Sequence, residues 1–490
     1  MFVGRVRAAS VGSRPIRVLG AACARSEQQT EIMSRRAITA QSGTIYPALR
    51  LGTVIPVGTE QLTIALFGLA IYLFCVHSFK LPIASAGIAI GLLGVLMNPG
   101  GLTFPLPFKL MAAFLAWCAL AATTSQFRSV VGDSLLDYLK ILLIFFVALN
   151  ASRTISQLAI FCGVWVLMFG LYPARGTYFN FLSGIGTFGR YGWNFSFANY
   201  NDLAAYAILA MALSAFLLAG RFPRWVRVAA LMSTGGLAVL VVITQSRGAF
   251  IGLVVAFCFM LLRSRSRARL IRVGVLASLG IVLVAPGAVW DRFSRMKFLF
   301  NTETIGEADG SAEQRYILLQ IAATIAKDHL LTGVGLGAYS EAHGMYAEER
   351  DDWQMGRGNR DAHNMYVSLA AESGLPGLAI FLGMIGSALL SSMRTERDLR
   401  ARFPIEAEQL RILRFGLIAY LIAAIFGSFH RASFLYLYVA ALWSASTLFE
   451  ALLTSAGSLG RASVSDLLAT STPLRGTALV RRNRMAFRPR

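Results

Sequence analysis

The sequence is poor in charged residues. Only 14% of its 490 residues are Asp, Glu, Lys or Arg, whereas a soluble globular protein carries about 25%. At the same time, 56% of the residues are hydrophobic and the mean hydropathy is +0.59. This balance excludes a chain of several soluble domains and indicates a polytopic membrane protein.

Acidic residues are the scarcest charged group: 25 Asp and Glu stand against 46 Lys and Arg, for a formal net charge of +21. No soluble domain carries this excess, which argues against nucleic-acid binding. The basic residues instead gather in short segments between apolar runs and at both ends of the chain. We therefore expect the charge to set membrane topology and to contact membrane lipids, with no nucleic-acid partner.

Cysteine is rare as well. Cys75, Cys118, Cys162 and Cys258 lie in apolar runs, and Cys23 lies near the N-terminus. None of them falls in the long loops expected on the outward face. We therefore expect no disulfide and no thiolate metal site.

What the sequence has instead is long apolar runs. A helix needs roughly 20 apolar residues to cross a bilayer, and a strand edge in lipid would leave backbone groups unpaired. The expected fold class is therefore an all-α polytopic integral membrane protein. We expect about twelve membrane spans, at 60–79, 81–97, 104–124, 133–150, 153–173, 198–219, 225–243, 247–262, 270–290, 364–392, 411–429 and 433–453.

Arginines in the connections orient these spans. They cluster at 221–227, 263–272, 394–414 and 481–490, and with twelve spans all four segments share the side of both termini, which we assign to the cytoplasm. The expected organisation is a basic cytoplasmic N-terminal tail (1–50), membrane helices one to nine (51–290) with an outward loop at 174–197, a large outward loop (291–362), helices ten to twelve (363–455) and a basic cytoplasmic C-terminal tail (456–490).

The first 30 residues are rich in Arg and poor in acids, a composition typical of an organelle transit peptide. The alternative is a misplaced start codon, with translation beginning at Met33. We favour the second interpretation and leave this stretch out of the fold.

The outward loop 291–362 is too long for a simple connection, and loops of this length are usually functional or disordered. Its segment "SAEQRYILLQIAATIAKDHLL" predicts an amphipathic helix near the membrane surface, because apolar residues follow Ser311 and Glu313 at helical spacing. The following "LTGVGLGAYS" has glycines at alternate positions. No strand precedes it and the full dinucleotide spacing is missing, so it predicts a tight turn rather than a nucleotide site.

Several polar residues stand where apolar segments meet the expected outward face. Arg247 interrupts two apolar runs, where an arginine snorkels, pairs or lines a cavity. Arg190 precedes the sixth span, and Arg315 lies on the predicted surface helix. His363 precedes the tenth span, and Asn364 is the first residue of that span. Each also has an ordinary interpretation, as a boundary cation, a loop cation, a lipid-phosphate contact or a residue that supports a helix start.

Taken together, these residues suit one kind of chemistry. Guanidinium groups bind pyrophosphate through paired hydrogen bonds, and an imidazole can accept the proton of a hydroxyl near neutral pH. The set suits a phosphate-bearing lipid donor attacked by an alcohol, with no metal, nucleotide or other cofactor. The remaining histidines have no comparable context and are expected to be structural: His77, His329, His343 and His430.

Four segments resemble motifs of the O-antigen ligase and O-antigen polymerase superfamily. "TQSRGAFIGL" is similar to its Ser-Arg-Gly motif, and "DAHNMYVSLAAESGLPGLAIFL" to its His-Asn motif followed by Glu and Gly-Leu-x-Gly. "GRYGWNFSFANYNDLAAYAI" resembles an arginine-containing stretch, and "EQRYILLQIAATIAKDHLLTGVGLGAYS" an arginine-led helix with a Gly-x-Gly turn. The resemblance covers about 185–390. One departure is "WNFSFANYND", where many relatives have Asn-Pro-Asn.

The resemblance implies a glycosyltransferase that moves a glycan from undecaprenyl diphosphate to an acceptor hydroxyl at the periplasmic face of the bacterial inner membrane. Arg190, Arg247 and Arg315 would hold the diphosphate, His363 would be the catalytic base, and Asn364 would support the acceptor or the helix start. The acceptor stays open between a lipid core, another glycan and a protein side chain. A transporter of an anionic solute is the alternative from another class, although the sequence shows no convincing internal repeat.

Overall fold

A computed structural model describes residues 63–470, apart from 79–82, 98–101, 188, 195–196, 264–266, most of 269–309, and 350–355. Within these residues the chain is helical, and the only extended pairing is an isolated bridge between Thr187 and Arg190. Residues Val54–Leu453 form one compact unit, which contains all five predicted site residues.

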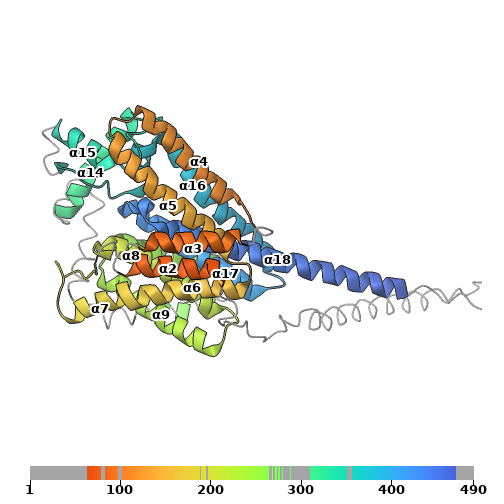
Figure 1. Cartoon of the computed structure of the whole chain (residues 1–490). Helices are drawn as coiled ribbons and strands as arrows, with labels where there is room; N and C mark the ends of the chain where they lie inside the picture. The colour runs from red at the N-terminus through yellow and green to blue at the C-terminus, as the bar shows by residue number, and fades with distance from the viewer. Residues whose placement is uncertain are drawn as a thin grey trace, which may run out of the picture. The chain divides into compact units, whose positions relative to one another are not determined.

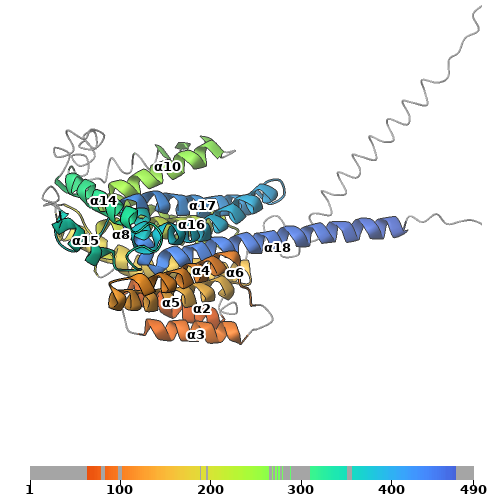
Figure 2. The ribbon, with the colours of Figure 1, turned by 90° about the horizontal axis from the view of Figure 1, so that it is seen from above.

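The described helices, labelled in Figures 1 and 2, follow one another without an intervening sheet. They are α2 (Ile64–His77), α3 (Ala84–Leu96), α4 (Leu106–Ala121), α5 (Arg128–Ala151), α6 (Ile155–Phe169), α7 (Arg175–Leu182), α8 (Tyr200–Ala219), α9 (Arg224–Ile243), α10 (Arg247–Arg263), α14 (Gly310–Asp328), α15 (Tyr339–Glu348), α16 (Met365–Leu399), α17 (Pro404–Ala423) and α18 (Ser433–Thr470). Short turns lie between them: η3 (Ala122–Thr124), η4 (Gly170–Ala174), η8 (Ala424–Phe426) and η9 (Phe429–Arg431).

Seven helical segments in the described part of the chain are long and apolar enough to cross a membrane. They are Leu106–Thr124, Ile155–Leu182, Tyr200–Ala219, Arg224–Ile243, Met365–Leu399, Pro404–Phe426 and Ser433–Thr454. Each matches one of the predicted spans. The class of polytopic helical membrane protein is therefore confirmed.

The other five predicted spans have different outcomes. Those at 60–79, 81–97 and 247–262 correspond to α2, α3 and α10, which are apolar but shorter than the seven. The span at 133–150 lies within α5, a helix of 24 residues that is not among the seven. The span at 270–290 lies almost wholly outside the described residues. A total of twelve spans stays a prediction.

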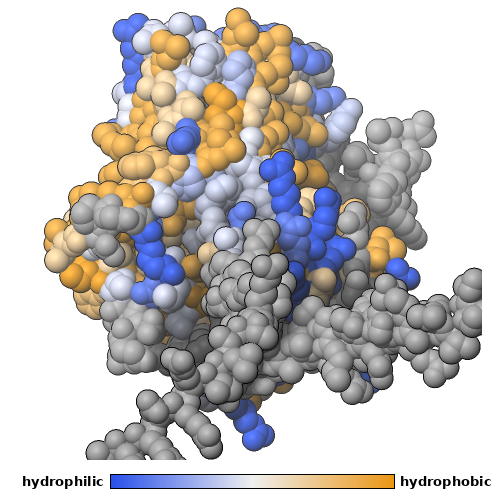
Figure 3. All heavy atoms as spheres, turned by 90° about the vertical axis from the view of Figure 1, so that its right-hand side faces the viewer, coloured by the Kyte–Doolittle hydropathy of each residue, from blue (hydrophilic) through white to orange (hydrophobic). Residues whose placement is uncertain are grey.

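Apolar side chains cover much of the surface, as a membrane environment requires. In the face shown in Figure 3, hydrophobic residues form large continuous areas between smaller hydrophilic groups. Large exposed apolar side chains occur on several helices, including Leu93, Leu120, Leu167, Met232 and Leu262. The interior is apolar as well, and its largest fully buried side chains include Trp165, Phe216, Tyr420 and Tyr436.

Small residues allow the first two helices to pack closely. A Cβ at Gly68 of α2 would lie 2.6 Å from Cα of Gly91 in α3, and one at Gly87 would lie 2.8 Å from the backbone nitrogen of Tyr72. Membrane helices lack a hydrophobic driving force toward one another, so close backbone packing through small residues takes its place. The contact between α2 and α3 therefore depends on glycine at these positions.

The predicted outward loop at 174–197 is wrong in its first half. Helix α6 continues through one π-helical turn at Gly170–Ala174, which contains Pro173, into α7. Proline removes a backbone donor, and the wider turn accommodates it without ending the helix. The connection to α8 therefore begins only after Leu182. Figure 1 shows α7 at the same end of the helices as α14 and α15.

The predicted amphipathic helix within 291–362 is present as α14, but its apolar side faces protein. Leu318, Ile321 and Ile325 are buried, and Ile321 and Ile325 belong to a cluster with Val334 and Tyr339. A second helix that the sequence did not predict, α15, supplies part of this cluster. The described part of this segment is therefore a packed helical region rather than a single helix lying on lipid.

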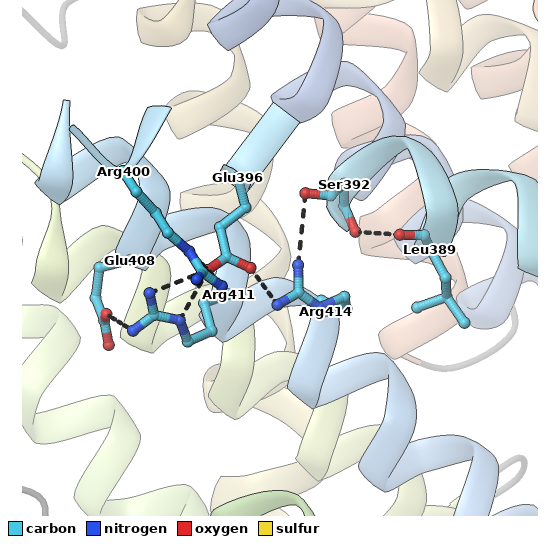
Figure 4. Close-up of polar contacts among 7 residues, drawn as sticks. All are labelled: Leu389, Ser392, Glu396, Arg400, Glu408, Arg411 and Arg414. Atoms are coloured by element: carbon cyan, nitrogen blue, oxygen red, sulfur yellow. Dashed lines mark hydrogen bonds and ion pairs between the residues drawn. The ribbon is translucent and has the colours of Figure 1, made fainter. Parts of the chain in front are cut away.

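A buried charge network joins the C-terminal part of α16 to the N-terminal part of α17. Glu396 accepts hydrogen bonds from Arg400, Arg411 and Arg414, and Arg411 also donates to Glu408 at 2.6 Å (Figure 4). The sequence placed Arg411 and Arg414 at a cytoplasmic boundary as topology charges. In the structure α17 begins at Pro404, seven residues earlier than predicted, and both guanidinium groups are buried against Glu396.

Helix α16 is broken in its first half. Gly374 has φ +68° and ψ 177°, which is not helical, and the following turn contains Pro376. The glycine turn after α14 packs into this break: the backbone nitrogen of Val334 donates to Ala371 O at 2.8 Å, and that of Leu375 donates to Leu330 O at 2.8 Å. The glycines therefore serve close backbone contact within the protein, as the predicted tight turn requires.

Candidate functional site

The loop that carries Arg190 is attached to the turn between α9 and α10. Arg190 Nε donates to Thr244 O at 3.0 Å, and its Nη2 donates to Asn201 Oδ1 at 3.0 Å. The same amide oxygen accepts from Ser246 Oγ at 3.0 Å. Asn201 thus joins the loop, the first turn of α8 and the residue before Arg247. These contacts bring Arg190 and the start of α10 together, although the two are far apart in sequence.

Arg247 is the first residue of α10 and is half-buried. The residue two before it, Gln245, has φ +52°, a left-handed conformation that is uncommon for a non-glycine residue. Its side chain donates to Gly189 O at 2.6 Å, which stabilises this conformation. Gly248 packs against Phe426, where a Cβ would lie 2.6 Å from the ring. The turn is therefore fixed on both sides of Arg247.

His363 is held in a constrained position immediately before α16. Its φ is +49°, and only one other non-glycine residue of the described chain, Gln245, has a positive φ. Asn364 is the N-cap of α16: its Oδ1 accepts from the backbone nitrogens of Tyr366 at 3.0 Å and Val367 at 3.2 Å. On the other side, Ala362 is buried in the cluster that includes α14. Strained backbone of this kind costs energy and is typical of functional sites.

The surroundings of His363 disfavour its charged form. Burial lowers the pKa of the imidazole, and the charge of Arg315 on α14 lowers it further. Asp361 acts in the opposite direction, and Arg360 again lowers the pKa. The net effect is a pKa below the ordinary value of about 6.5. His363 is therefore uncharged at neutral pH, and Arg315 lies within electrostatic range of it.

Two acidic residues show that the part of the site around Arg190 lies near the part around His363. Asp202 in the first turn of α8 and Asp361 before His363 are close enough to repel each other. Asp202 follows Asn201, the residue that holds Arg190. Farther along α16, Tyr366 donates to Leu421 O of α17 at 2.7 Å. All five predicted residues thus belong to one end of the helix assembly, with Arg190 beside the start of α10 and Arg315 within electrostatic range of His363.

Sequence reasoning missed a buried charged group close to this site. Glu372 of α16 is fully buried, with Arg431 Nη2 at 2.5 Å and His430 Nε2 at 3.3 Å from its two oxygens. His430 was expected to be merely structural, and Arg431 was not considered. The available signal was Glu372 itself, because an acidic residue inside an apolar run needs a partner.

His343, also expected to be structural, contacts the loop that carries His363. Its Nδ1 lies 3.0 Å from Gly358 O, and burial lowers its pKa. Among the side chains that the structure describes, no group of three or more His, Cys, Asp or Glu is arranged to hold a metal ion.

The fold and the site define a helical membrane protein that gathers arginines and an uncharged histidine at one end of its helices. Residues 232–382 match the family model described as O-antigen ligase, and this match supports the resemblance of that segment to the O-antigen ligase superfamily. Arg247, Arg315 and His363 fall inside the matched segment, and Arg190 precedes it. No curated protein matches the chain. The family match supports an enzyme of the glycan-transfer type in polysaccharide biosynthesis, with lipid-linked glycan substrates.

Proposed function

We propose that the protein transfers a glycan from undecaprenyl diphosphate to an acceptor hydroxyl at the periplasmic face of the bacterial inner membrane, without a metal ion. The observation that carries this proposal is the pairing of two kinds of group at one end of the helices. Arg190 is fastened beside Arg247 through Asn201 and Ser246. An imidazole with a lowered pKa, His363, lies within electrostatic range of Arg315.

In this proposal the arginines bind the diphosphate of the donor. A guanidinium stays charged and presents paired N–H donors that match phosphate oxygens. Negative charge builds up on the diphosphate as its bond to the sugar breaks, so cations already fixed in place favour the transition state over the bound donor. Arg190 is suited to this role because its guanidinium is held by Thr244 and Asn201, and Arg247 because the turn that carries it is held by Gln245.

His363 acts as the base. The acceptor oxygen forms a bond to the anomeric carbon of the glycan while the bond from that carbon to the diphosphate oxygen breaks. The hydroxyl proton passes to the neutral imidazole, and undecaprenyl diphosphate leaves with the bonding electron pair. The lowered pKa keeps His363 able to accept a proton at neutral pH. Asn364 keeps the start of α16, and hence His363, in place.

The test is transfer by purified protein with an undecaprenyl-diphosphate glycan and a panel of acceptors, in excess chelator, with products identified by mass. His363→Gln should lower turnover by about 100- to 10,000-fold, because an amide cannot accept the proton. Donor binding, measured separately, should persist. The wild-type rate should fall with acid only below about pH 6.5, since protonation of His363 removes the base.

A matched control is His329→Gln. His329 follows α14 on the same side of the protein, where its Nε2 lies 3.4 Å from Tyr346 Oη. This variant should transfer at nearly the wild-type rate. Wild-type turnover by His363→Gln would remove the base from the mechanism, and activity that returns only with a divalent ion would remove the metal-free part. Product mass also separates a lipid-directed ligase from a polysaccharide polymerase and from a protein O-oligosaccharyltransferase.

One observation bears on the transporter alternative. Helix α16 is interrupted at Gly374, and interrupted helices form substrate sites in many transporters. Here, however, the freed backbone groups bind the glycine turn, with Gly335 N donating to Glu372 O at 3.0 Å. The break is thus occupied by protein rather than lining an ion path, which supports glycan transfer over transport.

A further inference from the structure

The break in α16 contains a buried ionic group that the proposed mechanism does not use. Glu372 lies two residues before Gly374, and its carboxylate is fully buried. Arg431 donates through Nη2 both to this carboxylate at 2.5 Å and to Gly337 O at 3.0 Å. One guanidinium nitrogen thus joins three segments: α16, the glycine turn after α14, and η9.

Neighbouring contacts tie further helices to the same point. His430 O accepts hydrogen bonds from Tyr138 of α5 at 3.2 Å and from Tyr436 of α18 at 2.8 Å. Trp117 of α4 donates to Ser373 O at 2.9 Å. Burying a carboxylate is costly unless it is paired and fully hydrogen-bonded. In this protein the buried and paired carboxylate, that of Glu372, lies where the glycine turn packs against α16.

The glycine turn lies between α14, which carries Arg315, and α15, which precedes the loop of His363. It follows α14 directly, and Ile321 of α14 packs in one cluster with Val334 of the turn and Ala362, the neighbour of His363. Ser125 secures the turn from a third side by donating to Val334 O at 2.6 Å. The position of Arg315 relative to His363 therefore depends on how the turn is anchored.

We propose that Glu372 and Arg431 are a positioning pair, which anchors the glycine turn in the break of α16 and thereby holds Arg315 beside His363. The effect of the pair on glycan transfer rests on the proposed function. The positioning of Arg315 relative to His363 does not rest on the proposed function, because it concerns only the distance between these two side chains. Neither residue needs to touch the substrate.

The decisive measurement is an NMR titration of the His363 imidazole in isotope-labelled protein, with the signal assigned by its loss in His363→Gln. The charged groups acting on His363 are Arg315 on α14, and Arg360 and Asp361 on its own loop. Removing Arg315 as Arg315→Gln should raise the pKa of His363. Glu372→Gln should also raise it, because a loosened turn moves the Arg315 charge away.

The sign of the change separates positioning from a direct charge effect. Loss of the Glu372 negative charge would by itself lower the pKa of a nearby imidazole. A rise can therefore come only from altered surroundings. In the double variant, Glu372→Gln should add no further rise to that of Arg315→Gln. A full additional rise would show that general exposure of the imidazole is responsible, and would overturn the proposal.

The matched control is Glu396→Gln. This carboxylate is also buried in α16 and bound by arginines, but it lies at the other end of the helix (Figure 4). It should leave the titration of His363 unchanged. If the Glu372→Gln variant does not fold, the titration of His363 is carried out in Arg431→Lys instead. It keeps the positive charge, but a lysine cannot reproduce the planar guanidinium geometry at Glu372 and Gly337, so the same rise is expected.

Transfer assays then connect the pair to activity. A misplacement of about 1 Å can cost about 100-fold in rate, and we expect a loss of this order in Glu372→Gln. A raised pKa in a protein that transfers no glycan would uphold the positioning pair and refute the proposed function. An unchanged pKa in a folded Glu372→Gln variant of an active enzyme would refute the pair and leave the proposed function standing.

Discussion

Replacing Arg190 with lysine tests whether the geometry of its guanidinium group matters beyond its charge. Arg190 reaches Thr244 O and Asn201 Oδ1 at the same time, from Nε and Nη2, both at 3.0 Å. The guanidinium also packs over the ring of Tyr200, 4.5 Å from its centroid. A lysine ends in a single nitrogen on a flexible stem and cannot reproduce both bonds in the same geometry.

The magnitude follows from the contact that is lost. A hydrogen bond to a charged group contributes about 1.5–3 kcal/mol, and each 1.4 kcal/mol is a factor of about ten. If the two bonds orient Arg190 for the diphosphate, then Arg190→Lys should lower kcat/KM for the lipid-linked donor by about 10- to 150-fold. The stability of the folded protein should change much less, because the positive charge remains.

The assay is transfer from an undecaprenyl-diphosphate glycan at several donor concentrations, with thermal unfolding of each variant in detergent as a check on folding. Arg224→Lys is the matched control, since Arg224 is an exposed arginine at the start of α9. It should transfer like the wild type. If Arg190→Lys did the same, the contacts at Thr244 and Asn201 would have no part in donor binding, and the proposed role of Arg190 would be wrong.

Two further predictions concern the topology and the break in α16. Reporter fusions at Gly344 and after Arg490 should lie on opposite sides of the membrane, because arginine-rich connections face the cytoplasm; reporters on one side would refute this topology. Gly374→Ala should destabilise the folded protein by about 1–3 kcal/mol or more, because φ is +68° and a Cβ would overlap Leu331 O. Gly386→Ala, in the same helix with open space around it, is the control and should be neutral or slightly stabilising in a thermal melt. Equal melting temperatures for the two variants would show that the backbone at Gly374 does not require glycine.

The sequence alone determined the class of protein, because helix formation in a membrane is a local requirement. An apolar run must satisfy its own backbone hydrogen bonds in lipid, so its length and composition are sufficient to predict a helix. Seven predicted spans coincide with membrane-length helices. The motifs around Arg247 and His363 were equally local, and they pointed to the superfamily that the match at 232–382 supports.

Tertiary structure decided how these local features combine. Arg411 and Arg414 look like topology charges in the sequence, yet they are buried against Glu396 (Figures 2 and 4 show α16 beside α17 and their contact). In the sequence, Pro173 after α6 and Gly374 in α16 give no clear sign of whether each helix continues or breaks. The helix continues through Pro173 by way of a π-helical turn, whereas α16 breaks at Gly374, where the glycine turn supplies partners for the freed backbone groups.

The site depends on the same kind of long-range contact. Arg190 and Ser246 share the amide of Asn201, and Glu372 pairs with Arg431 across 59 positions of sequence. An acidic residue such as Glu372 inside an apolar run signals that a partner is needed, but no pattern within a single segment predicts which residue that partner is. A buried charge requires a partner, but only the packing of the helices determines which residue that partner is.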